Sequence, residues 1–94
     1  MAQRVPLTRD RIVTAAAREL GHLGIRANAV NPGPVDTGWA GPDLARRVGQ
    51  ALPAGRWGRP EDAARLVRWL ATDDAAWITG QVINSEGGFR RWAM

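Results

Sequence analysis

Two short runs of branched and small residues lie far apart in the chain, at Ile25 to Asn31 and at Gln81 to Asn84. The first is typical of a buried strand covered on both faces, and the second is typical of a short strand. The residues between them are predicted to be helical in two places. Strands that are joined through helices pair in parallel, with a right-handed crossover. The chain is therefore constrained to an α/β fold, in which a sheet of only two strands leaves two edges open.

Three helices are predicted around these strands. The first runs from Pro6 to about Gly21; Thr8 can cap its start, and Gly21 can end it in the left-handed conformation. The second follows Pro42 and runs from Asp43 to about Leu52. The third helix lies between the second helix and the last strand, so the predicted order is helix, strand, helix, helix, strand.

The third predicted helix runs from Pro60 to about Thr72 and has the strongest sequence signals. Pro60 suits a first helical turn, and Glu61 and Asp62 place carboxylates at the positive end of the helix dipole. Its apolar residues recur at helical spacing and define an expected core face, made of Ala63, Leu66, Val67 and Leu70.

Composition excludes several kinds of site. The 94 residues, of which 45% are hydrophobic, are predicted to form one domain, spanning residues 1–94. With no Cys and one His, the chain has no means of forming disulfides, thiolate nucleophiles or cysteine metal sites. We therefore expect no metal site.

The net charge of +4 does not form a basic patch. All thirteen basic residues are Arg, and they are interspersed with nine acidic residues along the chain. We therefore expect no nucleic-acid partner. No apolar run approaches the ~20 residues needed to cross a bilayer, and charged residues interrupt the N-terminal segment. The expected location is cytoplasmic, without membrane association.

Three separated motifs point to a family. They are the segments Gly24 to Thr37 (GIRANAVNPGPVDT), Gly58 to Asp62 (GRPED) and Thr79 to Gly88 (TGQVINSEGG). In this order, they resemble the C-terminal part of short-chain dehydrogenases/reductases, and the resemblance covers about Thr14 to Gly88. It implies a truncated Rossmann-like half with two parallel strands and three helices. Residues 1–13 would be a divergent N-terminal extension of the first helix within this single partial domain.

The resemblance also implies a cofactor loop. In the family, the loop after the first of these strands lies over the nicotinamide of NAD or NADP, which assigns cofactor binding to Pro32, Gly33 and Thr37. Carboxyl ends of parallel strands are where open α/β sheets place ligands. The alternative is a plain strand-terminating turn, in which Gly33 supplies a positive φ and Thr37 makes a local hydrogen bond.

No catalytic residue is predicted. The family uses a Tyr-x-x-x-Lys pair, in which the Tyr donates a proton while hydride reduces a carbonyl. Aligning its Glu-Leu-Gly at Glu19 to Gly21 places Ala2 at the Tyr position and Pro6 at the Lys position. The chain contains no Tyr and no Lys, and the Gly-rich dinucleotide fingerprint is absent. We expect this chain alone to bind the cofactor weakly or not at all.

Three functional hypotheses remain open. In the first, the chain is a catalytically incompetent fragment of an NAD(P)-dependent oxidoreductase. It would form a homo-oligomer, because in the family the last strand and the helix before it form a subunit interface. Trp69, Trp77 and the strand at 81–84 would lie in that interface. Alternatively, a separate polypeptide supplies the nucleotide-binding half and this chain completes the enzyme. The third is DNA binding, because residues 6–16 resemble the opening helix of tetracycline-repressor-type regulators, although no helix-turn-helix is predicted after them.

Overall fold

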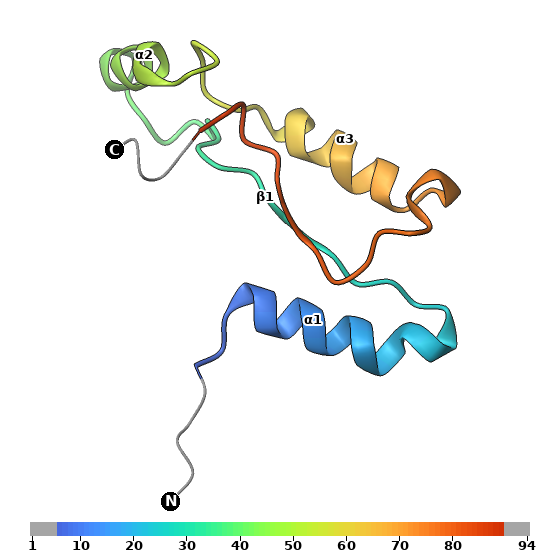
Figure 1. Ribbon diagram of the computed structural model, residues 1–94. Helices are drawn as coiled ribbons and strands as arrows, with labels where there is room; N and C mark the ends of the chain where they lie inside the picture. Colours follow the sequence, from blue (N-terminus) through green and yellow to red (C-terminus); the bar gives the residue numbers. More distant parts are fainter. Residues whose placement is uncertain (1–5, 90–94) are drawn as a thin grey trace, which may run out of the picture.

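The computed structural model describes residues 6–89. Its elements are α1 (Arg9–Leu20), the 3₁₀ turn η1 (Gly21–Leu23), β1 (Ala29–Asn31), α2 (Pro42–Ala51), α3 (Pro60–Leu70), the 3₁₀ turn η2 (Asp73–Ala75) and β2 (Val82–Asn84). Figure 1 shows α1 and α3 flanking the two strands, with α2 at one end of the molecule. The predicted α/β class and the order helix, strand, helix, helix, strand are confirmed.

The sheet is a parallel pair. Ala29 lies opposite Val82, Val30 opposite Ile83 and Asn31 opposite Asn84. The prediction that the first strand begins at Ile25 was wrong, since the paired region contains only its last three residues. The backbone before it bonds to a loop instead: the amide of Ala27 donates to Thr79 Oγ1, and its carbonyl accepts from the amide of Gly80.

The start of α1 follows its sequence signal, and its end does not. The side chain of Thr8 accepts a hydrogen bond from the amide of Arg11, as expected of a cap. Gly21, however, keeps right-handed helical angles, and the chain continues into η1. The left-handed residue is Gly24, with φ of 75°, whose amide donates to the carbonyl of Gly21. Two glycines were available as stop signals, and the helix uses the later one.

Both ends of α3 are held by side chains. At its start, the carboxylate of Asp62 accepts a hydrogen bond from the amide of Arg59. At its end, the guanidinium of Arg26 donates to the carbonyl oxygen of Leu70 at 2.7 Å, and also to those of Thr72 and Ile78. A cation at the carbonyl end of a helix is favoured by the dipole. Arg26 thus joins the extended segment before β1 to the end of α3.

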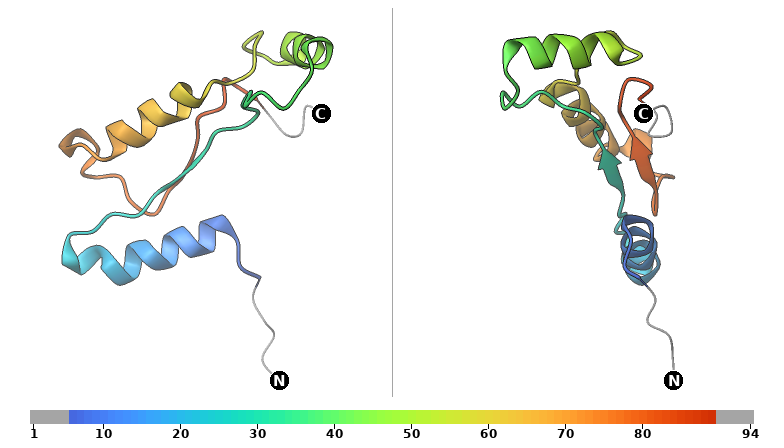
Figure 2. Two further views of the ribbon diagram at one scale, coloured as in Figure 1. Left: turned by 180° about the vertical axis from the view of Figure 1, so that it is seen from behind. Right: turned by 90° about the vertical axis from the view of Figure 1, so that its left-hand side faces the viewer.

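Helices α1 and α3 lie on opposite sides of the strand pair, as the views from front and back show (Figures 1 and 2). Helix α1 packs against β2, and α3 packs against β1. Few apolar residues between positions 6 and 89 are buried, namely Val13, Leu70 and Ala75. The prediction that β1 is fully covered was wrong, because Ala29 and Val30 are only half-buried.

The expected core face of α3 is confirmed only in part. Leu70 is buried, and Ala63 and Leu66 are half-buried, but Val67 is 54% exposed. A stripe this wide needs a neighbouring layer on both flanks, and α3 packs against β1 and the adjacent turn η2, which leave Val67 uncovered. The prediction that Val67 is a core residue was wrong.

Helix α2 is attached differently from the other two. It lies apart from the sheet, beyond the start of α3 (Figure 2). The indole Nε1 of Trp57 donates to the carbonyl of Ala45 at 2.7 Å, and its ring lies against buried Gly49. The ring of Trp39 meets that of Trp57 edge-on, with centroids 5.7 Å apart.

None of the helices between residues 6 and 89 is long and apolar enough to cross a membrane.

Candidate functional site

The loop that leaves β1 is anchored by the side chain of Asn31. This residue is 6% exposed. Its Nδ2 donates to Asn84 Oδ1 at 3.1 Å and to Glu86 Oε2 at 3.3 Å, and its Oδ1 accepts from the amide of Gly33. The amide of Ser85 donates to its backbone carbonyl. One buried amide side chain therefore links the ends of both strands and the turn that follows β1.

A second contact holds the same loop further along. The amide of Gly58 donates to the carbonyl of Pro34, and the amide of Asp36 donates to the carbonyl of Gly58. Val35 and Gly58 form an isolated parallel bridge. A Cβ on Gly58 would lie 3.0 Å from the carbonyl oxygen of Pro34, so this approach depends on glycine.

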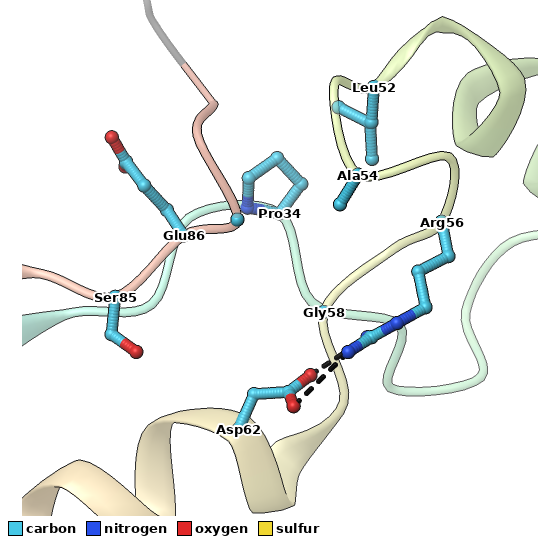
Figure 3. A pocket seen from close by; sticks show the side chains of 9 residues that line it. Pro34, Leu52, Ala54, Arg56, Gly58, Asp62, Ser85 and Glu86 are labelled. Atoms are coloured by element: carbon cyan, nitrogen blue, oxygen red, sulfur yellow. Dashed lines mark hydrogen bonds and ion pairs between the residues drawn. The ribbon is translucent and has the colours of Figure 1, made fainter.

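A cavity of about 250 Å³ lies beside this loop (Figure 3). It is lined by Pro34, Leu52, Ala54, Arg56, Gly58, Asp62, Ser85, Glu86 and Gly87. Figure 3 shows the Arg56 and Asp62 side chains paired on one side and the Glu86 carboxylate directed away from them. The cavity is smaller than the ~300–1,000 Å³ usual for ligand pockets.

The ion pair at this cavity is bidentate. Arg56 Nη1 lies 2.8 Å from Asp62 Oδ2, and Arg56 Nη2 lies 3.3 Å from Asp62 Oδ1. The hydrogen bond from Arg56, together with that from the amide of Arg59, lowers the pKa of Asp62 to about 2. The same partnership raises the pKa of Arg56. Asp62 is thus ionised at neutral pH and ties the segment after α2 to the first turn of α3.

The three residues assigned to the cofactor lie in the loop that follows β1. Pro32 and Thr37 are exposed, and Gly33 is half-buried. Gly33 has φ of 64°, the positive value that the turn alternative requires. Beside Thr37, a local side-chain hydrogen bond is made by Asp36, whose Oδ1 accepts from the amide of Gly38. None of the three lines the neighbouring cavity, and their role in cofactor binding stays a prediction.

The positions aligned with the family's catalytic pair add no chemistry. Pro6 is exposed and precedes the cap of α1, and Ala2 lies outside the described residues. Among residues 6–89, no group of three or more His, Cys, Asp or Glu is placed to hold a metal ion.

A dinucleotide does not fit these residues alone. Its pyrophosphate needs a strand followed closely by a glycine-rich turn and a helix N-terminus. Here β1 ends at Asn31, and the next helix begins only at Pro42, after a proline-containing loop. The described residues can offer the loop after β1 as one wall of a cofactor site, and they lack the phosphate cradle.

Sequence reasoning missed the side chains that organise this region. The roles of Arg26, Asn31 and Glu86 depend on partners more than forty positions away, which no local pattern reveals. The Arg56–Asp62 pair had a partial signal, because an acidic residue near the start of a helix often accepts a backbone hydrogen bond.

Comparisons with known proteins agree on one family. Residues 10–90 match the family model described as enoyl-(acyl carrier protein) reductase. The chain is 52% identical over 75 residues to the uncharacterized oxidoreductase YjdA of Bacillus subtilis, which covers 80% of this chain and 30% of that protein. It is 41% identical over 75 residues to 3-oxoacyl-[acyl-carrier-protein] reductase FabG of Thermotoga maritima, covering 77% of this chain and 30% of that protein.

A further relative is 2,3-dihydroxy-2,3-dihydro-p-cumate dehydrogenase of Pseudomonas putida, 41% identical over 83 residues, with 82% of this chain and 32% of that protein covered. The chain thus spans about a third of the length of these relatives. The order of the three motifs, the parallel strand pair and these matches together show that the chain belongs to the short-chain dehydrogenase/reductase family, of which it represents the C-terminal part.

Proposed function

We propose that these residues supply the C-terminal part of an NAD(P)-dependent short-chain oxidoreductase and do not catalyse alone. One observation carries the proposal: the loop Asn31 to Thr37 leaves the carboxyl end of a parallel strand, in a sequence without any Tyr or Lys. The proton donor and the phosphate cradle then come from a nucleotide-binding segment, either in the same polypeptide or in a separate one.

An incompletely covered face supports this proposal. A hollow of about 490 Å³ runs along the segment before and within β1 and along α3, and it is lined by Gly24, Arg26, Asn28, Val30, Val67, Leu70 and Ala71. In the described residues β1 pairs only with β2, so its other edge has free backbone donors and acceptors. A strand of the nucleotide-binding segment placed at this edge would satisfy those groups and extend the sheet.

The substrate is not assigned by this part of the fold. Two relatives whose names state different substrates, an oxoacyl-acyl carrier protein and a dihydrodiol of p-cumate, are equally identical to the chain. We therefore propose the reaction class, hydride transfer with a nicotinamide cofactor, without a particular substrate.

A segment exchange tests the proposal. In the Thermotoga maritima reductase, the matching C-terminal segment is replaced by residues 10–90 of this chain. We expect the hybrid to bind NADPH and to oxidise it with an oxoacyl substrate, followed at 340 nm, whereas the 94-residue chain alone gives no more than the heat-inactivated control. Turnover by the isolated chain, or a folded hybrid that does not bind NADPH, would contradict the proposal.

A matched pair of variants examines the loop in that hybrid. Thr37→Val removes a hydroxyl from the predicted cofactor loop and is expected to weaken NADPH binding. Thr14→Val makes the same change on the exposed part of α1 and is expected to have no effect. Equal affinities for both variants would remove Thr37 from the cofactor site.

Self-association is a second candidate, favoured by exposed indoles. Trp69, near the end of α3, is 42% exposed. Trp77, in the loop that leads to β2, is 98% exposed. Trp is enriched in interfaces because a large flat surface is buried at little conformational cost. We propose a homo-oligomer that buries Trp69, Trp77 and the strand region at 81–84, whose outer edge is open in the described sheet.

Light scattering at micromolar concentration tests this second proposal. We expect an oligomer for the unmodified chain and a smaller species for Trp69→Glu. Trp39→Glu is the matched control, because Trp39 is also exposed but belongs to the α2 region. A monomer for the unmodified chain, or an oligomer that survives Trp69→Glu, would contradict this interface.

DNA binding has no such support. The oxidoreductase match begins at residue 10, within the regulator-like segment, and α1 is followed by η1 and β1 instead of a second helix.

A further inference from the structure

We propose that Asn31 and Glu86 are a positioning pair, which fixes the backbone of the Pro32–Gly33 turn by joining it to the loop after β2. The importance of that turn for a cofactor rests on the proposed function above. The joining itself is a property of this chain and can be measured without a cofactor.

Asn31 makes the hydrogen bonds that connect the Pro32–Gly33 turn to the loop after β2. It is the one polar residue that is buried among residues 6–89, and each polar atom of its side chain has a partner. Its amide nitrogen reaches Asn84 and Glu86 beyond β2, and its amide oxygen receives the hydrogen bond of Gly33. An amide suits this place because it donates on one side and accepts on the other. A carboxylate could only accept.

Glu86 contributes shape as well as charge. A Cβ built on Gly33 would lie 2.6 Å from the Cβ of Glu86, so the two loops touch at van der Waals distance. The positive φ of Gly33 and this contact both require glycine. The turn is therefore held by a hydrogen bond to the Asn31 side chain and by van der Waals contact with Glu86.

The charges around the pair are identifiable. Arg9 and Asp10 at the start of α1 line the hollow that also includes Asn31 and Asn84. Across the neighbouring cavity, Arg56 and Asp62 neutralise each other in their ion pair. Glu86 is consequently the carboxylate that would oppose a new negative charge at position 31, because it accepts directly from that side chain.

Amide hydrogen exchange of Gly33 measures how firmly the turn is held, because this amide donates to Asn31 Oδ1. The ratio of its protection to that of Ala29, whose amide donates to Gln81 in the strand pair, removes the contribution of global unfolding. In Asn31→Asp we expect this ratio to fall about ten-fold at neutral pH, because the donor is lost and two carboxylates face each other. The ratio should recover on acidification, since a protonated carboxyl can donate again.

Rescue and a matched control separate positioning from general destabilisation. In the double variant Asn31→Asp with Glu86→Gln, the new amide at position 86 donates and the new carboxylate at position 31 accepts. This variant should recover most of the ratio at neutral pH. Asn28→Asp makes the same change three residues earlier in the chain, where the side chain bonds to Ile78 and Gln81. It should lower overall stability without lowering the Gly33 ratio, because any local loosening here reduces the protection of the reference amide of Ala29 and not that of Gly33.

Glu86→Ala keeps the test decisive if Asn31→Asp does not fold. It removes the acceptor for Asn31 but keeps the Cβ that lies against Gly33, and should lower the ratio about three-fold, as expected for one lost hydrogen bond. A ratio within experimental error of the unmodified chain in Glu86→Ala, or no rescue in the double variant, would overturn the inference. Neither result depends on whether the hybrid enzyme binds NADPH, so the two proposals fail separately.

Discussion

The sheet region and the α2 region of this molecule are held together in different ways. In the sheet region, β1, β2, α1 and α3 are joined by backbone pairing and by side chains that reach across the chain, such as Arg26 to the end of α3. The α2 region depends on the indole of Trp57, on the Trp39 contact and, through the segment that follows it, on the Arg56–Asp62 pair.

The two regions therefore take their stability from different kinds of contact. Contacts between distant segments are lost together when the sheet unfolds, so they contribute to one cooperative unit. Contacts within residues 36–62 can be lost while the sheet persists. We expect α2 to open more readily than the strand pair.

The largest effect is expected in the sheet region, at the buried last residue of α3. Leu70→Ala removes a side chain that is 8% exposed and should lower the free energy of unfolding by about 2–5 kcal/mol. Val67→Ala on the same helix, at a site that is 54% exposed, should change it by no more than about 0.5 kcal/mol. Urea denaturation of both variants measures the two values. Equal losses would mean that α3 packs through a different face.

A smaller and local effect is expected for α2. Trp57→Phe keeps an aromatic ring beside Gly49 but removes the donor to the carbonyl of Ala45, at a net cost of about 0.5–1.5 kcal/mol. The amides of α2 should exchange several-fold faster, while those of β1 keep their protection. Trp39→Phe serves as the control, because it keeps a ring beside Trp57 and removes none of the hydrogen bonds described between residues 6 and 89. If the β1 amides accelerate equally, the two regions unfold as one unit and the comparison fails.

The smallest effect is a loss of stability in acid. The folded state lowers the pKa of Asp62 from 3.8 to about 2, so its contribution is present above pH 4 and is lost as the pH falls from about 4 towards 2. Asp62→Asn should abolish this part of the pH dependence, whereas Asp43→Asn, which removes a highly exposed pair with Arg46, should not. Thermal unfolding between pH 2 and pH 5 distinguishes them. A steeper acid loss in Asp62→Asn than in the unmodified chain would reverse the assigned sign.

Much of the fold followed from local signals, and much of the site did not. Thr8, Pro42 and Pro60 mark helix starts through backbone chemistry that acts over a few residues, so those starts were predictable to within a few positions. The choice of Gly24 over Gly21 depended on whether η1 would form. The exposure of Val67 depended on which layer lies against α3. The resemblance identified the loop after β1, but the bonds of Asn31 to Asn84 and Glu86 required the strand register.

The parallel register also sets the order in which the chain can acquire its structure. Asn31 and Asn84 are neighbours in space but are separated by 53 positions, so pairing must close a long loop before any cross-strand bond forms. Helix α1 has only local hydrogen bonds and can form as it leaves the ribosome, whereas β1 waits for β2 to be synthesised. During that interval the edge of β1 has no partner from within residues 6–81. Slower translation of the segment from α2 to η2 therefore lengthens the interval in which β1 lacks its pairing with β2.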